Sequence, residues 1–257
     1  MGAESRRLGR WLRLGAVLPL IGILVLHTSQ IEATTWRAVT KTCPLDGTEV
    51  TNFVPGSTYI SDLTPDFRPL GVGVDWFLSA YIMCPTCGFT ARYEAFDDTE
   101  GLDRTRVLEA LRRLEASSLF RERDSAIAVE MNWHNDPHVL AHLALGAKWL
   151  ADDTGDPAII QDRLGRAIEA HKTALAHEGF AAEQKPHYLY LIGELLRQKG
   201  EREEAIKWFD RAREAGDERI RGLAEQQRLL AVYQDKPVEQ PLAAVAQGTP
   251  DEKVKAI

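Results

Sequence analysis

Residues 189–212, LYLIGELLRQKGEREEAIKWFDRA, decide the fold of the second half of the chain. Apolar side chains recur every three or four residues on both sides of Gly200, which indicates two amphipathic helices joined by a short turn. Small residues stand at Gly193 in the first helix and at Ala205 and Ala212 in the second. Because small side chains let helix backbones approach closely, we expect the helices to cross at Gly193, with Ala205 facing it.

The spacing of these small residues resembles that of the tetratricopeptide repeat (TPR), in which two antiparallel helices cross closely. Ala205, Phe209 and Ala212 follow Gly193 by 12, 16 and 19 residues, which agrees with that repeat without a gap. The resemblance implies a concave helical surface that binds a peptide or protein partner. A generic helical hairpin is the alternative.

A looser copy of the pattern lies upstream. Gly146 stands in its first helix and Ala167 in its second, but 21 residues separate them. We therefore expect nine extra residues in the turn around 152–155. Since a stack of such units needs about three repeats to bury its faces, we expect helices at 103–117 and 217–234 to cover its ends.

A period of 3.6 residues begins near Leu102 and predicts a helical domain over residues 102–234. Asp136-Pro137 is a start signal because aspartate caps a helix and proline fits its first position. The acidic loop at 152–157 is expected to end that helix. The expected helices are 103–117, 125–131, 137–150, 158–178, 185–199, 202–215 and 217–234. Residues 235–257 contain three prolines and are expected to form a mobile tail.

Residues 36–98 have the composition of a small β-rich module. Prolines and glycines between residues 55 and 73 predict a loop in its middle. Period-two alternation and β-branched residues predict strands at 36–42, 49–54, 78–83 and 89–96. A sheet of about four short strands buries little apolar surface, so such a module needs a metal or a neighbouring domain. The expected fold class is α+β, mainly α, with antiparallel helical hairpins following the module.

Two similar turns lie within this module: CPLDG at 43–47 and CPTCG at 84–88. The second has the form of a zinc knuckle, whose paired thiolates occupy two corners of a tetrahedron. The first has an aspartate where the second cysteine would be, and zinc also accepts carboxylate oxygen. The candidate zinc ligands are therefore Cys43, Asp46, Cys84 and Cys87. A metal-free remnant of a zinc fold is the alternative.

Two catalytic uses of the same residues remain open. Cys84 and Cys87 resemble the pair of a thiol oxidoreductase, but such a pair normally opens a helix, whereas a strand-like run follows Gly88. A water in place of Asp46 would leave the zinc open and reactive, as in a hydrolase.

Other candidate motifs are incomplete. His138 and His142 lie four residues apart on an expected helix, with His134 nearby, but no glutamate of the H-E-x-x-H type accompanies them. We interpret these histidines as surface or interface residues. The acidic loop at 152–156 lacks the ligand spacing of a calcium loop, so we interpret it as a solvated loop. No nucleophile elbow, Walker loop or dinucleotide fingerprint is present.

Charge and the N-terminal sequence bear on partners and location. The formal net charge is −7, and residues 1–33 contribute four arginines and two glutamates, so the remaining chain carries −9. This balance argues against nucleic acid and anionic lipid surfaces as partners. Residues 14–26 form an uncharged apolar run of about 20 Å as a helix, which is typical of a signal peptide. Cleavage after Ala33, or a membrane anchor at residues 11–26, would place the rest of the chain outside the cytoplasm.

The order of the two cysteine turns and the TPR-like helices resembles a bacterial family described only as a domain of unknown function. Its members join a zinc-ribbon-like head to TPR-like helices, and the likeness covers about Val39 to Tyr233. The resemblance implies this architecture and a non-catalytic role. We therefore expect an exported or membrane-anchored interaction protein with a zinc-ribbon-like head. The alternative is an extracytoplasmic enzyme, either a thiol oxidoreductase or a zinc hydrolase.

Overall fold

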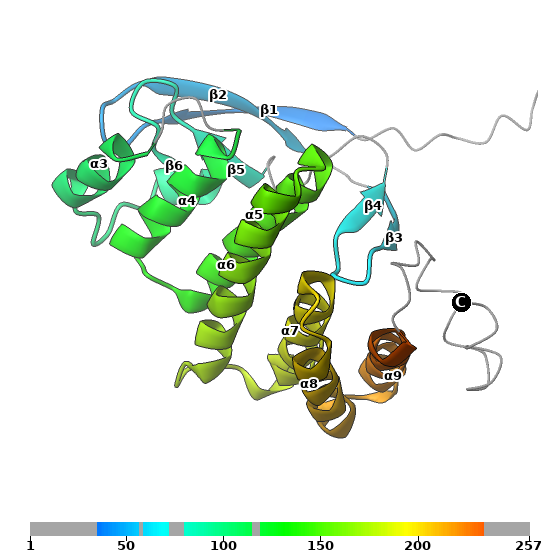
Figure 1. Ribbon diagram of the computed structural model, residues 1–257. Helices are drawn as coiled ribbons and strands as arrows, with labels where there is room; N and C mark the ends of the chain where they lie inside the picture. The colour runs from blue at the N-terminus through cyan, green and yellow to red at the C-terminus, as the bar shows by residue number, and fades with distance from the viewer. Residues whose placement is uncertain (1–34, 57–58, 72–79, 115–118, 234–257) are drawn as a thin grey trace, which may run out of the picture. The chain divides into compact units, whose positions relative to one another are not determined.

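The computed structural model describes residues 35–56, 59–71, 80–114 and 119–233, all of which belong to one compact unit (Figure 1). The predicted signal segment at 1–33 and the predicted tail at 235–257 lie outside the described residues. Among the helices that are described, none combines the length and the apolar character needed to cross a membrane.

The described chain is mainly helical with small antiparallel sheets, which confirms the coarse fold class. Seven α-helices are described: α3 (Arg104–Arg112), α4 (Arg121–Asn132), α5 (Pro137–Thr154), α6 (Pro157–Ala176), α7 (Lys185–Lys199), α8 (Arg202–Ala215) and α9 (Glu218–Tyr233). From α3 to α9, each helix packs against the next one in the chain. The predicted bounds of α7 and α8 are confirmed, because Gly200 ends α7 with a left-handed backbone (φ +90°).

The end of α5 differs from the prediction. Asp136 caps its start as expected, since its carboxylate accepts hydrogen bonds from the backbone N–H groups of His138 and Val139. The helix then continues through the acidic residues to Thr154, because Asp152 forms an ion pair with Lys148 one turn earlier (2.8 Å). Only two residues separate α5 from α6. The prediction that the nine extra residues of the upstream copy lie in the turn is therefore wrong. They lengthen α5 and α6 instead.

The β-structure consists of three separate two-stranded antiparallel sheets, so the prediction of one sheet of about four strands is wrong for the described residues. The pairs are β1 (Trp36–Thr42) with β2 (Glu49–Pro55), β3 (Ile60–Leu63) with β4 (Pro69–Gly71), and β5 (Tyr81–Met83) with β6 (Thr90–Arg92). The run predicted as a strand at 89–96 keeps only three strand residues. A 3₁₀ helix (Tyr93–Phe96) follows them and turns Phe96 onto Phe89, with ring centroids 5.2 Å apart.

The hairpin of β3 and β4 lies where a loop was predicted. Its turn is closed by the backbone N–H of Thr64, which donates to the carbonyl of Arg68 (2.9 Å), and by Phe67 N–H, which donates to the carbonyl of Thr64 (2.8 Å). Pro69 is tolerated because β4 pairs on one side only within the described residues.

The cysteine turns share a hydrophobic core with the first helices. Ile82 and Phe89 of the head are fully buried in one cluster with Val107 of α3 and Val129 of α4. The change of period near residue 102 therefore marks no break in the packing.

Helix α7 is the centre of the second core. Its residues 188–196 are all buried, and it packs against α6, α8 and α9. A close crossing at Gly193 is confirmed, since a Cβ added there would lie 2.8 Å from two ring carbons of Phe209 in α8. The nearest residue is thus Phe209 rather than Ala205, because the flat ring fills the space that the missing side chain leaves.

Candidate metal centre

Two turns of the same conformation form the candidate site. In each, the N–H of the first cysteine donates to the carbonyl five residues later (2.8 Å), and its carbonyl accepts from the glycine four residues later (2.9 Å). The glycines, Gly47 and Gly88, have φ values of +77° and +79°, which side chains rarely adopt. The glycine of each motif is therefore required by the turn, and the aspartate in the first turn does not alter its backbone.

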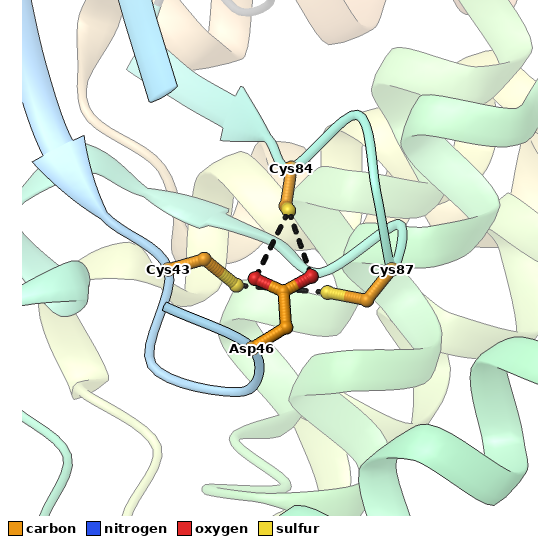
Figure 2. A group of neighbouring side chains, drawn as sticks. All are labelled: Cys43, Asp46, Cys84 and Cys87. Atoms are coloured by element: carbon orange, nitrogen blue, oxygen red, sulfur yellow. Dashed lines mark hydrogen bonds between the residues drawn. The ribbon is translucent and has the colours of Figure 1, made fainter. Parts of the chain in front are cut away.

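All four residues singled out in the sequence come together (Figure 2). The ligand atoms of Cys43, Asp46, Cys84 and Cys87 lie within 4.8 Å of one another. Cys43 Sγ lies 3.5 Å from Cys87 Sγ, and Cys84 Sγ lies 3.5 Å from Asp46 Oδ2. Each short contact joins one turn to the other, so the two turns form a single site.

This donor set fits one zinc ion. With zinc–sulfur and zinc–oxygen bonds of about 2.3 and 2.1 Å, two ligands of a tetrahedron lie about 3.6–3.8 Å apart. The contacts of 3.5 Å between Cys43 and Cys87, and between Cys84 and Asp46, are within a few tenths of an ångström of that separation. Three sulfurs and one carboxylate oxygen also suit zinc better than magnesium or calcium, which prefer oxygen ligands.

Asp46 is held as an anion. Burial pushes the pKa of its carboxyl group upward, but hydrogen bonds from Thr48 outweigh this and lower the pKa to about 2. One of these bonds runs from the backbone N–H of Thr48 to Asp46 Oδ1 (2.9 Å). The carboxylate is therefore ionised at neutral pH and needs to release no proton to bind a metal.

Two of the thiols, those of Cys43 and Cys87, are held in the protonated state. Burial raises the pKa of Cys43 to about 11, against hydrogen bonds from the backbone of Leu45 and Asp46 that lower it. Burial likewise raises the pKa of Cys87 well above its usual value. Thiols in such surroundings are weak nucleophiles on their own. A bound cation would displace their protons and favour the thiolate form.

The support around the site was not predicted from the sequence. Thr48 Oγ1 donates to Thr86 Oγ1 across the two turns (3.1 Å), and both residues follow or lie inside the cysteine motifs. Val50, Ile82 and Phe89 form a buried apolar floor beneath the turns. The sequence signal for the contact between Thr48 and Thr86 is a threonine in or next to each cysteine motif. That signal is informative once the two turns are known to face each other.

The other sequence candidates have local roles. His138 Nδ1 lies 3.1 Å from the hydroxyl of Tyr188. His142 Nδ1–H donates to the carbonyl of His138 in the same helix (2.8 Å). His134 lies 3.3 Å from a carboxylate oxygen of Glu130. Across the part of the chain that the structure describes, no histidine joins a cluster of three metal-binding side chains.

The acidic loop is more ordered than expected. Asp152 pairs with Lys148, Asp153 pairs with Arg68 (2.7 Å), and Asp156 caps α6. Asp153 and Asp156 are exposed to solvent, as expected, whereas Asp152 is half-buried. The prediction of a loop is wrong for residues 152–154, because they belong to α5.

One family model matches the chain. The family described as "Uncharacterized protein conserved in bacteria (DUF2225)" matches residues 78–231, which is more than half of the chain. The match includes Cys84, Cys87 and all described helices up to residue 231, whereas Cys43 and Asp46 lie outside it. No curated protein and no solved structure matches.

Proposed function

The chain belongs to the bacterial family DUF2225, and we propose that it is an exported or membrane-anchored interaction protein without catalytic activity. In this proposal a TPR-like stack of helices binds a protein partner, and one zinc ion stabilises the fold of a zinc-ribbon-like head. The observation that carries it is the convergence of three thiols and one carboxylate, all within 4.8 Å, in a head that shares its core with the helices.

The zinc has a structural role in this proposal. Cys43, Cys84, Cys87 and Asp46 would hold it, and their four donor atoms complete a tetrahedron without water. The ion would supply folding free energy rather than reactivity. Such a contribution matters here because the described part of the head forms two-stranded sheets, which are marginally stable without further packing or a metal.

The enzyme alternatives have less support. A thiol oxidoreductase would use Cys84 and Cys87, yet the short sulfur–sulfur contact joins Cys43 to Cys87, and β6 rather than a helix follows the motif. A zinc hydrolase would need an open coordination position, which the ionised Asp46 carboxylate is placed to fill.

The helical pairs support the interaction role. α5 with α6 and α7 with α8 are successive hairpins with short turns, and Gly193 lies at a close crossing of α7 and α8. This arrangement is what a TPR-like array requires, and arrays of this kind present extended surfaces to peptide or protein partners.

Site-specific photo-crosslinking in the bacterial host tests the interaction role. A photoreactive amino acid at His142, which is exposed on α5, should give a discrete adduct with a partner protein. The same residue at Lys207, whose side chain is 70 % exposed on α8, is the matched control and should not give that adduct. Absence of a discrete adduct at His142 at native expression levels would contradict the interaction role.

The location is tested independently. Fractionation of cells that express the protein with a C-terminal tag should place it in the envelope or the medium. Recovery only from the cytosol would contradict export, and the intact mass of the purified protein distinguishes cleavage after Ala33 from an uncleaved anchor.

A further inference from the structure

The three cysteines differ in what each sulfur faces and in how accessible it is. Cys87 Sγ lies 3.5 Å from Cys43 Sγ, across the two turns (Figure 2). The S–H of Cys84 instead donates to Oδ2 of Asp46, 3.5 Å away. Cys43 and Cys84 are buried, whereas Cys87 is partly exposed. Of the three cysteines, Cys87 is therefore the one that a reagent in solution reaches first.

A bond between Cys43 and Cys87 requires only a small movement of one turn relative to the other. The sulfurs of a disulfide are about 2.0 Å apart, so the separation of 3.5 Å has to shrink by about 1.5 Å. The β1–β2 and β5–β6 hairpins, which carry the turns, belong to separate sheets. The movement therefore breaks no strand pairing among the described residues.

The alternative pair, Cys84 with Cys87, lies within a single turn. Two backbone hydrogen bonds close that turn: Cys84 N–H donates to the carbonyl of Phe89 (2.8 Å), and Gly88 N–H donates to the carbonyl of Cys84 (2.9 Å). A disulfide at Cys84 would also consume the S–H that donates to Asp46. A bond between Cys43 and Cys87 leaves both the turn and this contact intact, so it is the favoured pairing.

We propose that Cys43 and Cys87 form a site of reversible oxidation, at which a peroxide joins their sulfurs in a disulfide and the metal is released. Cys84 and Asp46 stay unmodified and keep their contact. The release of metal rests on the proposed zinc centre, whereas the choice of the sulfur pair rests on the contacts of the sulfurs alone.

The reaction balances as a two-electron oxidation of the two sulfurs. The Cys87 thiolate attacks one oxygen of hydrogen peroxide, so that an S–O bond forms, the O–O bond breaks and hydroxide leaves. The Cys43 thiolate then attacks the sulfur of this sulfenic acid. The S–S bond forms, the S–O bond breaks and a second hydroxide leaves. Cys84 and Asp46 remain as donors, which is fewer than the four ligands of a structural zinc site.

The disulfide replaces the connection that the metal would provide. It joins the turn that follows β1 to the turn that follows β5, and such a cross-link stabilises a protein chiefly by restricting its unfolded chain. Loss of the metal through oxidation therefore leaves the two hairpins connected, whereas removal of the metal by a chelator does not. A dithiol reductant reverses the bond by thiol–disulfide exchange.

Oxidation of the full-length protein, reduced and loaded with zinc, tests the pairing without any substitution. The protein is treated with hydrogen peroxide and its remaining thiols are then alkylated. Chymotryptic cleavage after Phe53 and Tyr81 separates Cys43 from the other two cysteines, and fragment-ion sequencing of the linked peptides identifies its partner. We expect Cys43 linked to Cys87, Cys84 alkylated, and zinc released in step with the disulfide, as read with a chromophoric chelator. Dithiothreitol should reverse the bond and restore zinc binding.

Cys84→Ser and Cys43→Ser are matched variants, because each removes one sulfur and leaves two. All proteins are compared reduced and metal-free, after circular dichroism has shown that they are folded. Cys84→Ser keeps the proposed pair and should form a disulfide within about twofold of the rate of the unchanged protein. Cys43→Ser keeps only the pair within one turn and should react about tenfold more slowly or less.

Three results would overturn the inference: a disulfide between Cys84 and Cys87 in the unchanged protein, equal rates in the two variants, or no disulfide at all. These results are separable from failure of the zinc centre. A protein that holds no zinc contradicts the proposed centre, and peptide mapping of the metal-free protein still decides the pairing. A zinc-loaded protein in which peroxide forms no bond between Cys43 and Cys87 contradicts this inference alone.

Discussion

Cys43 Sγ and Cys87 Sγ lie 3.5 Å apart although 44 positions separate them in the sequence. The contact joins the first turn to the second, and the carboxylate of Asp46 makes the reciprocal contact with Cys84. The two turns therefore act as one structural unit, and a metal bound there would connect the β1–β2 hairpin to the β5–β6 hairpin.

From this pairing we expect Cys43→Ser and Cys87→Ser to have the same effect, although the family match contains only one of them. Each should remove a zinc ligand and lower the melting temperature of the zinc-loaded protein by about 5 °C or more, because the metal's binding free energy contributes to folding. Thermal unfolding monitored by circular dichroism measures this, with Lys207→Ala on the exposed side of α8 as control. A normal melting temperature in Cys43→Ser would show that the first turn does not belong to the site.

The crossing of α7 and α8 gives a prediction with an internal control. Gly193→Ala would place a Cβ 2.8 Å from the ring of Phe209, and overpacking of this kind costs about 1–3 kcal/mol. Gly165→Ala in α6 meets no atom within 4 Å, so it should instead stabilise the protein by about 0.5–1 kcal/mol. Urea unfolding of both variants measures the difference. Equal effects of the two substitutions would contradict the close crossing.

The buried pair of Asp66 and Lys148 predicts a dependence of stability on pH. Burial pushes the pKa of Asp66 upward, but attraction to Lys148 outweighs it, so its pKa lies below the usual value near 4. A lowered pKa stabilises the folded state above the unfolded pKa, and this contribution is lost as the pH falls through the folded value. Burial raises the pKa of Asp152 against attraction to Lys148. Asp152 is present both in the unchanged protein and in an Asp66→Asn variant, so a comparison of the two isolates Asp66.

Asp66→Asn should therefore cost about 3–5 kcal/mol at pH 7, because it leaves Lys148 without one of its buried partners. The difference from the unchanged protein should shrink below about pH 4. Urea midpoints at pH 7 and pH 3 measure this, with Asp98→Asn at an exposed position as control. A difference that stays constant down to pH 3 would mean that Asp66 is not ionised in the folded protein.

Much of the helical fold could be predicted from the sequence because its signals are local. Gly200 and the apolar spacing around it locate α7 and α8, and the two cysteine motifs predict their own turns. The convergence of those turns on one centre also follows from their chemistry, since isolated knuckles need partners to complete a tetrahedron.

The turn at Thr64–Arg68, between β3 and β4, could not be predicted because residues distant in the sequence hold it in place. Prolines and glycines around residues 55–73 indicate a loop, whereas Asp66 is fixed by Lys148, 82 positions away. The left-handed backbone of Phe67 also contradicts the preference of an aromatic residue. The predicted end of α5 was also wrong. The sequence around Asp152 indicates a loop, and its ion pair with Lys148 is visible only in the structure.

Asp46 is the one proposed ligand that is not a cysteine, and its substitution tests whether it takes part in the site. Asp46→Ala should weaken zinc binding about tenfold or more, because one of four donors is lost. Asp46→Cys should strengthen it, since a fourth thiolate completes an all-sulfur set, which zinc favours in closed sites. Competition with a chromophoric chelator measures both affinities. Unchanged affinity in Asp46→Ala would exclude the carboxylate as a ligand.

Elemental analysis of the full-length protein, purified without chelator, tests the account most directly. We predict one zinc ion per chain in the unchanged protein and its loss in Cys84→Ala, with Lys207→Ala retaining the metal. A folded protein that contains no zinc, and takes up none when zinc is supplied, would contradict the central claim that Cys43, Asp46, Cys84 and Cys87 form a structural metal centre.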